Sequence, residues 1–139
     1  VLQTEGQGST TVDGRAVQDL AGKPLANAPE WVVNALARYD FSVGAYPSFI
    51  QLGAQFRDEV QSGIANDPNT IVGSRTLVDT QFGTSFMDDS VSVSVFARNL
   101  FEEAFPETIV GMPFDTGGYA QFRTLEAERT FGATVQMNF

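Results

Sequence analysis

The sequence contains neither cysteine nor histidine. Without cysteine it has no disulfide framework, no thiol nucleophile and no thiolate metal site. Without histidine it lacks Ser-His-Asp catalysis, metal sites built on His and Glu, and the usual proton shuttle of neutral pH. Because these two absences remove most familiar hydrolase mechanisms, we expect no enzyme activity and no cofactor.

Long apolar runs are missing as well. No run approaches the roughly 18 residues of a membrane-spanning helix, and the N-terminus lacks the basic-then-apolar order of a signal peptide. Neither absence excludes a membrane-spanning β-strand, whose signal is alternation. Lys and Arg total 8 against 17 Asp and Glu, a net charge of −9, so we expect no nucleic-acid partner. The 139 residues are enough for one ordinary domain or part of one.

The clearest pattern is the terminal stretch from Arg129 to Phe139, RTFGATVQMNF. Residues alternate almost perfectly between an apolar set and an uncharged polar set, which is the period of a β-strand with one face in an apolar environment. The apolar set begins with one arginine, and the stretch ends on an aromatic residue. The apolar set is Arg129, Phe131, Ala133, Val135, Met137 and Phe139, and the polar set is Thr130, Gly132, Thr134, Gln136 and Asn138.

Four earlier stretches share this period, and no helical period extends over twelve residues. The predicted strands cover about 30–42, 48–60, 76–86, 90–101 and 126–139. Residues 1–29 are predicted to form an extracellular loop, with a short strand near Thr10 to Val12. The connections alternate long and short, so short turns pair neighbouring strands as hairpins. The fold class is therefore all-β, an antiparallel up-and-down sheet, interpreted as a segment of a transmembrane β-barrel.

Two architectures can use such strands, a soluble β-sandwich that serves as a binding or adhesion module, or a β-barrel in a membrane. The barrel is favoured because the polar faces suit a wet interior, aromatic residues gather near the strand ends, and short turns alternate with long loops. Each strand is also long enough to cross a bilayer at a tilt. The charges predicted to face the lumen are Arg38, Asp40, Arg57, Asp79 and Arg98. They serve either as a stabilising charge ladder or as contacts to a plug or an anionic ligand.

Several ordered pieces resemble the C-terminal end of a TonB-dependent outer-membrane receptor. They are DLAGKPLANAPEW at 19–31, VDTQFGTSF at 78–86, FARNLF at 96–101 and the terminal strand, so the resemblance covers about 19–139. It implies a barrel of twenty-two strands in the bacterial cell outer membrane that imports a siderophore, cobalamin, glycan or similar bulky nutrient. The implied partners are outer-membrane lipid, the transported small molecule and the TonB complex. With no stretch that matches a plug or a Ton box, the chain is interpreted as a fragment holding the last five strands.

The terminal strand also resembles the outer-membrane assembly signal, in which a polar residue, a glycine and alternating hydrophobic residues lead to an aromatic end. The matching residues are Thr130, Gly132, Val135, Met137 and Phe139. The resemblance implies recognition by the barrel-assembly machinery through strand pairing. The alternative is that Phe139 is only an interfacial anchor.

Two acidic pieces contain residue types that are typical of functional sites. Asp115-Thr116-Gly117 matches the DTG of aspartic proteases, but it occurs once and lies in a Gly/Pro-rich stretch, so we interpret it as a loop turn. Asp88-Asp89 supplies too few oxygen ligands for a calcium site and is interpreted as a solvated hairpin turn.

Overall fold

The computed structural model describes residues 9–12, 15–18, 21–88, 90–112, 114–115 and 117–138. These residues form antiparallel strands, which confirms the all-β prediction. They divide into two compact units. The sheet unit is Trp31–Arg57, Arg75–Phe105 and Thr124–Phe139, and the hairpin unit is Val1–Glu30, Asp58–Ser74 and Pro106–Arg123.

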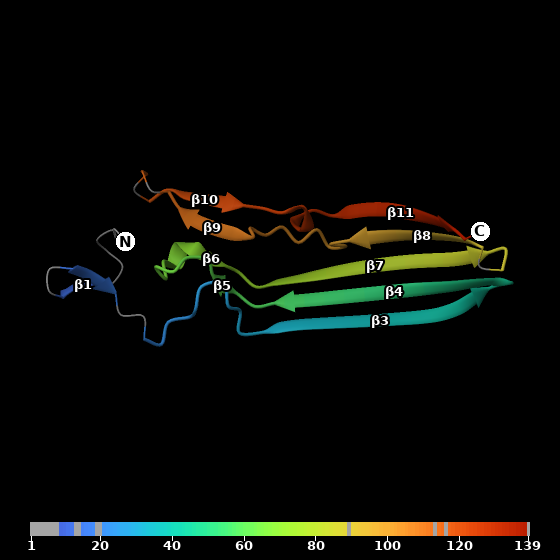
Figure 1. The fold of residues 1–139 in the computed structure, drawn as a ribbon, viewed down its shortest axis with the longest axis horizontal. Coiled ribbons are helices and arrows are strands. Elements are labelled where there is room, and N and C mark those ends of the chain that lie inside the picture. Colours follow the sequence, from blue (N-terminus) through green and yellow to red (C-terminus); the bar gives the residue numbers. More distant parts are fainter. Residues whose placement is uncertain are drawn as a thin grey trace. The chain divides into compact units, whose positions relative to one another are not determined.

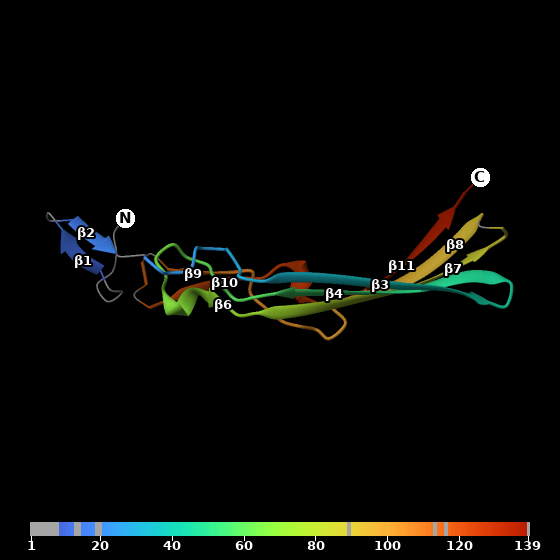
Figure 2. The same cartoon turned by 90° about the horizontal axis from the view of Figure 1, so that it is seen from below.

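The sheet unit is one five-stranded antiparallel sheet in the order β11-β8-β7-β4-β3 (Figure 1). Its strands are β3 (Val32–Val43), β4 (Tyr46–Arg57), β7 (Arg75–Phe86), β8 (Val91–Arg98) and β11 (Thr130–Met137). Successive strands of the sheet are neighbours, so the connectivity is up-and-down. Seen from below, the strands form a single twisted layer (Figure 2).

Local backbone conformation explains why strand ends differ from the predicted ranges. β4 begins at Tyr46 because Gly44, at φ 62°, forms a two-residue turn with Ala45. β8 ends at Arg98 because Asn99 has φ 48°, a left-handed conformation that asparagine tolerates. β11 begins at Thr130 because the preceding residues form the 3₁₀ turn η2 (Leu125–Ala127).

The hairpin unit contains one short strand that agrees with the prediction near Thr10 to Val12, and others within the long connections that the sequence pattern did not predict. β1 (Ser9–Val12) pairs with β2 (Arg15–Gln18), β5 (Val60–Gln61) with β6 (Ile71–Val72), and β9 (Thr108–Gly111) with β10 (Tyr119–Phe122). The 3₁₀ turn η1 (Pro68–Thr70) precedes β6. No helix in the described part of the chain is long and apolar enough to span a membrane.

A small core holds the hairpin unit together. Val60, Val72 and Ile109 come from three separate strands and are buried against one another. Buried Gln61 donates hydrogen bonds from Nε2 to the Asp67 carbonyl at 2.8 Å and to Thr70 Oγ1 at 2.6 Å. This amide therefore fixes the turn that leads into β6.

Candidate functional site: the two faces of the sheet

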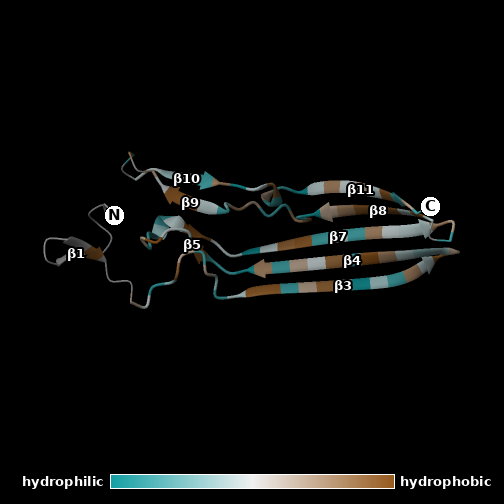
Figure 3. Cartoon of the chain, viewed as in Figure 1, coloured by the Kyte–Doolittle hydropathy of each residue, from teal (hydrophilic) through white to brown (hydrophobic). Residues whose placement is uncertain are grey.

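The register of the five strands places most of their apolar residues on one common face. One row of directly opposite residues crosses all five strands, from β3 to β11: Ala37, Leu52, Thr80, Ala97 and Phe131. Because side chains alternate along a strand, this single row fixes the face of every other residue. Figure 3 shows the resulting alternation of hydropathy along the strands. No charged residue lies on this apolar face within the five strands.

The apolar face is exposed. Tyr39 is 68% exposed, Leu52 48%, Val95 51%, Phe131 66% and Val135 59%. Second-layer packing of a soluble sandwich would bury such residues. In the described structure this face is instead open to its surroundings, and a contiguous apolar surface of this kind marks an interaction with a membrane or a protein.

Two hydroxyl groups on the apolar face, those of Ser48 and Thr80, donate hydrogen bonds within the sheet. Ser48 and Thr84 are cross-strand partners, and the Ser48 hydroxyl donates to Thr84 Oγ1 at 3.0 Å. The Thr80 hydroxyl donates to the Gln51 carbonyl at 3.3 Å. These polar atoms therefore do not depend on water, which is the requirement that a hydrocarbon environment imposes.

Aromatic residues mark both ends of the apolar face. At the end with the short β3–β4 turn, Tyr39 stacks on Phe41 with ring centroids 5.7 Å apart, and Tyr46 contacts Phe86 at 5.0 Å. At the other end lie Phe56 of β4 and, just before β3, Trp31, which is 65% exposed, whereas Phe131 lies between the two groups in the row of Ala97. Aliphatic and alanine side chains occupy most of the surface between the two groups.

The five predicted charges all lie on the opposite, polar face. Arg38 Nη2 lies 2.9 Å from Asp40 Oδ1, and the Arg38 guanidinium lies 3.8 Å from the centroid of the Phe49 ring. Arg98 lies over the Phe96 ring at 5.2 Å. Arg57 lies directly opposite Arg75. Arg75 was not among the charges predicted for this face, although its position continues the alternation of β7 by one step. With Arg75, this face carries four arginines and two aspartates in a chain of net charge −9.

Asp79 participates in a second feature that the sequence did not reveal, a hydrogen-bonded junction centred on Asn99. Asn99 is 3% exposed, and its backbone N–H donates to Asp79 Oδ1 at 2.9 Å. Its side chain donates to the carbonyls of Glu103 and Glu126 and accepts from the Glu103 N–H. An asparagine that follows a strand is a recognisable turn signal, but its partners are far apart in the sequence.

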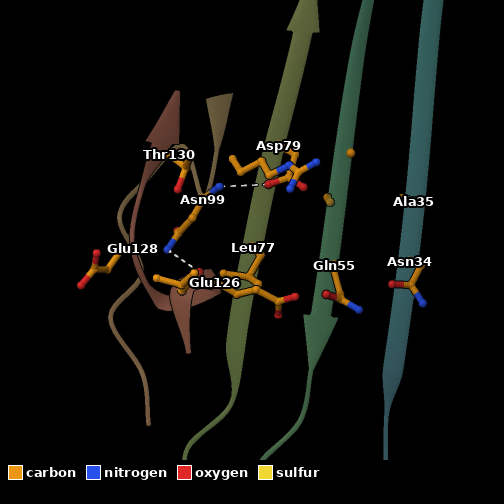
Figure 4. A pocket seen from close by; sticks show the side chains of 13 residues that line it. Asn34, Ala35, Gln55, Leu77, Asp79, Asn99, Glu126, Glu128 and Thr130 are labelled. Atoms are coloured by element: carbon orange, nitrogen blue, oxygen red, sulfur yellow. Dashed lines mark hydrogen bonds between the residues drawn. The ribbon is translucent and has the colours of Figure 1, made fainter. Parts of the chain in front are cut away.

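An open cavity of about 620 Å³ lies on the polar face beside this junction. Its lining includes the amides of Asn34 and Gln55, the charged groups of Asp79 and Arg98, and the carboxylate of Glu126. Figure 4 shows Asn34 and Gln55 at the same level of neighbouring strands, with Asp79 one strand further on. The volume lies in the range of small-molecule sites, and the groups that line it are mostly polar.

The assembly-signal residues divide between the two faces of β11. Thr130 and Gly132 lie on the polar face, Val135 and Met137 lie on the apolar face, and Phe139 lies outside the described residues. Gly132 lies opposite Phe96, whose ring covers the glycine so closely that a Cβ atom at this position would overlap it. This contact explains Phe96, the one aromatic residue on the polar side of β8.

The two acidic pieces lie in turns. Asp115 belongs to the connection between β9 and β10, where its N–H donates to the Met112 carbonyl at 3.4 Å and its carbonyl accepts from the Gly118 N–H at 3.1 Å. Thr116 and Asp89 lie outside the described residues, and Asp88 has φ 52° in the β7–β8 turn. Across the described part of the chain, no cluster of three or more Asp or Glu residues is arranged to hold a metal ion.

Comparison with protein-family models, curated proteins and solved structures finds no match for this chain.

Proposed function

We propose that this chain is part of the barrel wall of a TonB-dependent outer-membrane receptor, which transports a bulky nutrient and performs no chemistry on it. The observation that carries the proposal is the uncharged, mainly apolar and largely exposed face that extends across five antiparallel strands. Lipid is the occupant this face suits best, because the face carries no charge and the hydroxyl groups of Ser48 and Thr80 are hydrogen bonded within the sheet. The polar face would then line the lumen.

The spacing of the aromatic residues supports a bilayer. Ten residue steps separate Trp31, the residue just before β3, from Phe41 within β3. At about 3.3 Å per residue they span about 33 Å, which a tilt of about 40° reduces to about 25 Å across the membrane. That value equals the usual height of the apolar band of outer-membrane barrels, which aromatic residues flank on both sides.

The edges of the sheet support a larger assembly. β3 and β11 each have one neighbour in the sheet, so each has backbone N–H and C=O groups on its other side that no strand of the sheet satisfies. Further barrel strands would satisfy them, whereas in lipid such edges are costly. Under this proposal β11 carries the signal to the assembly machinery, and the ligand is a siderophore, cobalamin, glycan or similar nutrient.

The single tryptophan tests the proposal directly, because Trp31 is placed at one border of the apolar band. In vesicles of brominated phosphatidylcholine, we expect lipid brominated near the headgroup to quench Trp31 fluorescence more than lipid brominated near the chain end. In the Trp31→Phe/Leu52→Trp variant the order of quenching should reverse. The matched variant Trp31→Phe/Gln51→Trp, on the polar face, should be quenched weakly by both lipids. Equal, weak quenching at positions 51 and 52 would contradict the proposal and favour the soluble module.

A further inference from the structure

Three glycines lie on the polar face of the sheet, and an aromatic ring covers only two of them. Phe49 covers Gly83, and Phe96 covers Gly132, so that a Cβ atom at either glycine would overlap a ring. Such aromatic coverage compensates for the missing side chain in a strand. Gly53 has no ring over it, since a Cβ atom there would meet only Leu36 at 3.8 Å and Asp79 at 4.0 Å.

Gly53 lines two cavities on the polar face, and the space that they share above it is here called the hollow over Gly53. The cavity of about 620 Å³ and a second of about 360 Å³ share three lining residues, Gly53, Asp79 and Arg98. A glycine inside a strand often marks a place where another group approaches the backbone closely. Here the backbone at Gly53 is the floor of a hollow that the side chains of its neighbours surround.

Three side-chain amides lie around the hollow, and each of them can both donate and accept hydrogen bonds. On β4, Gln51 and Gln55 flank Gly53 on the same face, and Asn34 lies opposite Gln55. Among the described residues the side-chain amides of these three make no hydrogen bond. The charged groups that line the two cavities are one guanidinium and three carboxylates, so the lining has no excess of cations: Arg98, Asp79, Glu126 and Glu128.

We infer that the hollow over Gly53 binds a neutral, polyhydroxylated ring, such as one sugar residue of a glycan. A ring of this kind can occupy the space that a phenylalanine ring takes at the other two glycines. Planar amides present a donor and an acceptor side by side and so match neighbouring hydroxyl groups. An anionic chelate would instead require an excess of cations. This inference rests on the proposed function, because it assigns the class of transported ligand.

The test uses the 139-residue chain in lauryldimethylamine oxide, a detergent without a sugar headgroup. Maltotriose, cellotriose, xylotriose and citrate are titrated while NMR follows the side-chain amides of Asn34, Gln51 and Gln55. We expect at least one trisaccharide to cause saturable shifts in all three amides, and citrate to cause none. Absence of shifts with every trisaccharide, or equal shifts with citrate, would overturn the inference.

Variants then locate the binding. Gly53→Val fills the hollow without backbone strain and should weaken trisaccharide binding by about ten-fold or more, the effect expected when hydrogen bonds to a ligand are lost. Gly73→Val, at a glycine with nothing within 4 Å, is the matched control and should bind normally. Gln55→Leu should also weaken trisaccharide binding. If Gly53→Val does not fold, the affinity of Gln55→Leu tests the site in its place. Unchanged affinity in the folded variants would overturn the site.

A spin-labelled fatty acid added to the same samples tests the membrane proposal independently of the sugar site. Broadening of the Ile50 and Leu52 methyl signals without amide shifts would leave the membrane proposal standing and refute the sugar site. Amide shifts without methyl broadening would support the site and contradict the membrane proposal.

Discussion

At the scale of single residues, the contact between Gly132 and Phe96 gives a glycine of the assembly signal a structural role. We predict that Gly132→Ala displaces the Phe96 ring and lowers the free energy of unfolding by about 1–2 kcal/mol, as overpacking commonly does. In a Phe96→Ala background the same substitution should cost little, because the overlapping ring is gone. Urea unfolding in lipid vesicles measures this double-mutant cycle.

Gly53→Ala is the matched control for that cycle. It adds the same methyl group on the same face, but its contacts are ordinary van der Waals contacts. We expect its stability to change by less than about 0.5 kcal/mol. Equal effects of the two substitutions, or additive effects in the cycle, would mean that Phe96 does not cover Gly132.

Tyr119 gives a pH-dependent prediction in the hairpin unit. Its hydroxyl donates to Asp67 Oδ2 at 2.7 Å, and this hydrogen bond, followed by desolvation, raises the pKa of Tyr119 above 10.0. This hydrogen bond can form only while the Tyr119 phenol keeps its proton. Its stabilisation is therefore complete below pH 10, the unfolded-state pKa, and is lost as the pH rises through the higher folded-state pKa.

NMR titration of the Tyr119 ring carbon attached to oxygen checks this prediction. The midpoint should lie above 10.0 in the native chain and move down in Asp67→Asn, which removes the carboxylate acceptor. A native midpoint at or below 10.0, or one that Asp67→Asn leaves unchanged, would show that this hydrogen bond does not form in solution.

At the scale of one element, β4 shows how the two faces differ. Leu52 lies near the middle of the apolar face and Gln51 beside it on the polar face. If the apolar face contacts lipid, Leu52→Arg should lower the free energy of unfolding in a bilayer by about 2–4 kcal/mol, the cost of an arginine near the membrane centre. Gln51→Arg should change it by less than about 1 kcal/mol, because lumen positions accept charge.

Urea titration of both variants in the same vesicles makes the comparison. A Gln51→Arg variant that is destabilised as strongly as Leu52→Arg would show that arginine is poorly tolerated on both faces of this strand. A neutral Leu52→Arg variant would show that the apolar face contacts water.

At the scale of the whole molecule, the sequence predicted the all-β class and the face of each strand, because period-two alternation follows directly from strand geometry. The alignment of those faces into one surface could not be read from any single strand, since it depends on turns such as Gly44-Ala45. Apart from the strand near Thr10 to Val12, the short strands of the long connections escaped prediction because they are only two to four residues long. Their core joins Val60, Val72 and Ile109 from distant segments.

The polar face was predicted less completely. The positions of its five charges followed from alternation, and Arg75 would have followed from one more step of the same pattern. The junction at Asn99 and the hollow over Gly53 depend on which strands lie side by side. Alternation in one strand carries no information about that arrangement.

The measurement that tests the lipid-facing surface most directly is a spin-label scan of β4, which the absence of native cysteine makes simple. Single cysteines at positions 49 to 56 are labelled in vesicles, and the accessibility of each label to oxygen and to a water-soluble nickel chelate is measured. We predict that oxygen accessibility is highest at even positions and nickel accessibility at odd positions. Low accessibility of the even positions to both reagents would contradict the account, because it would mean that protein and not lipid covers the apolar face.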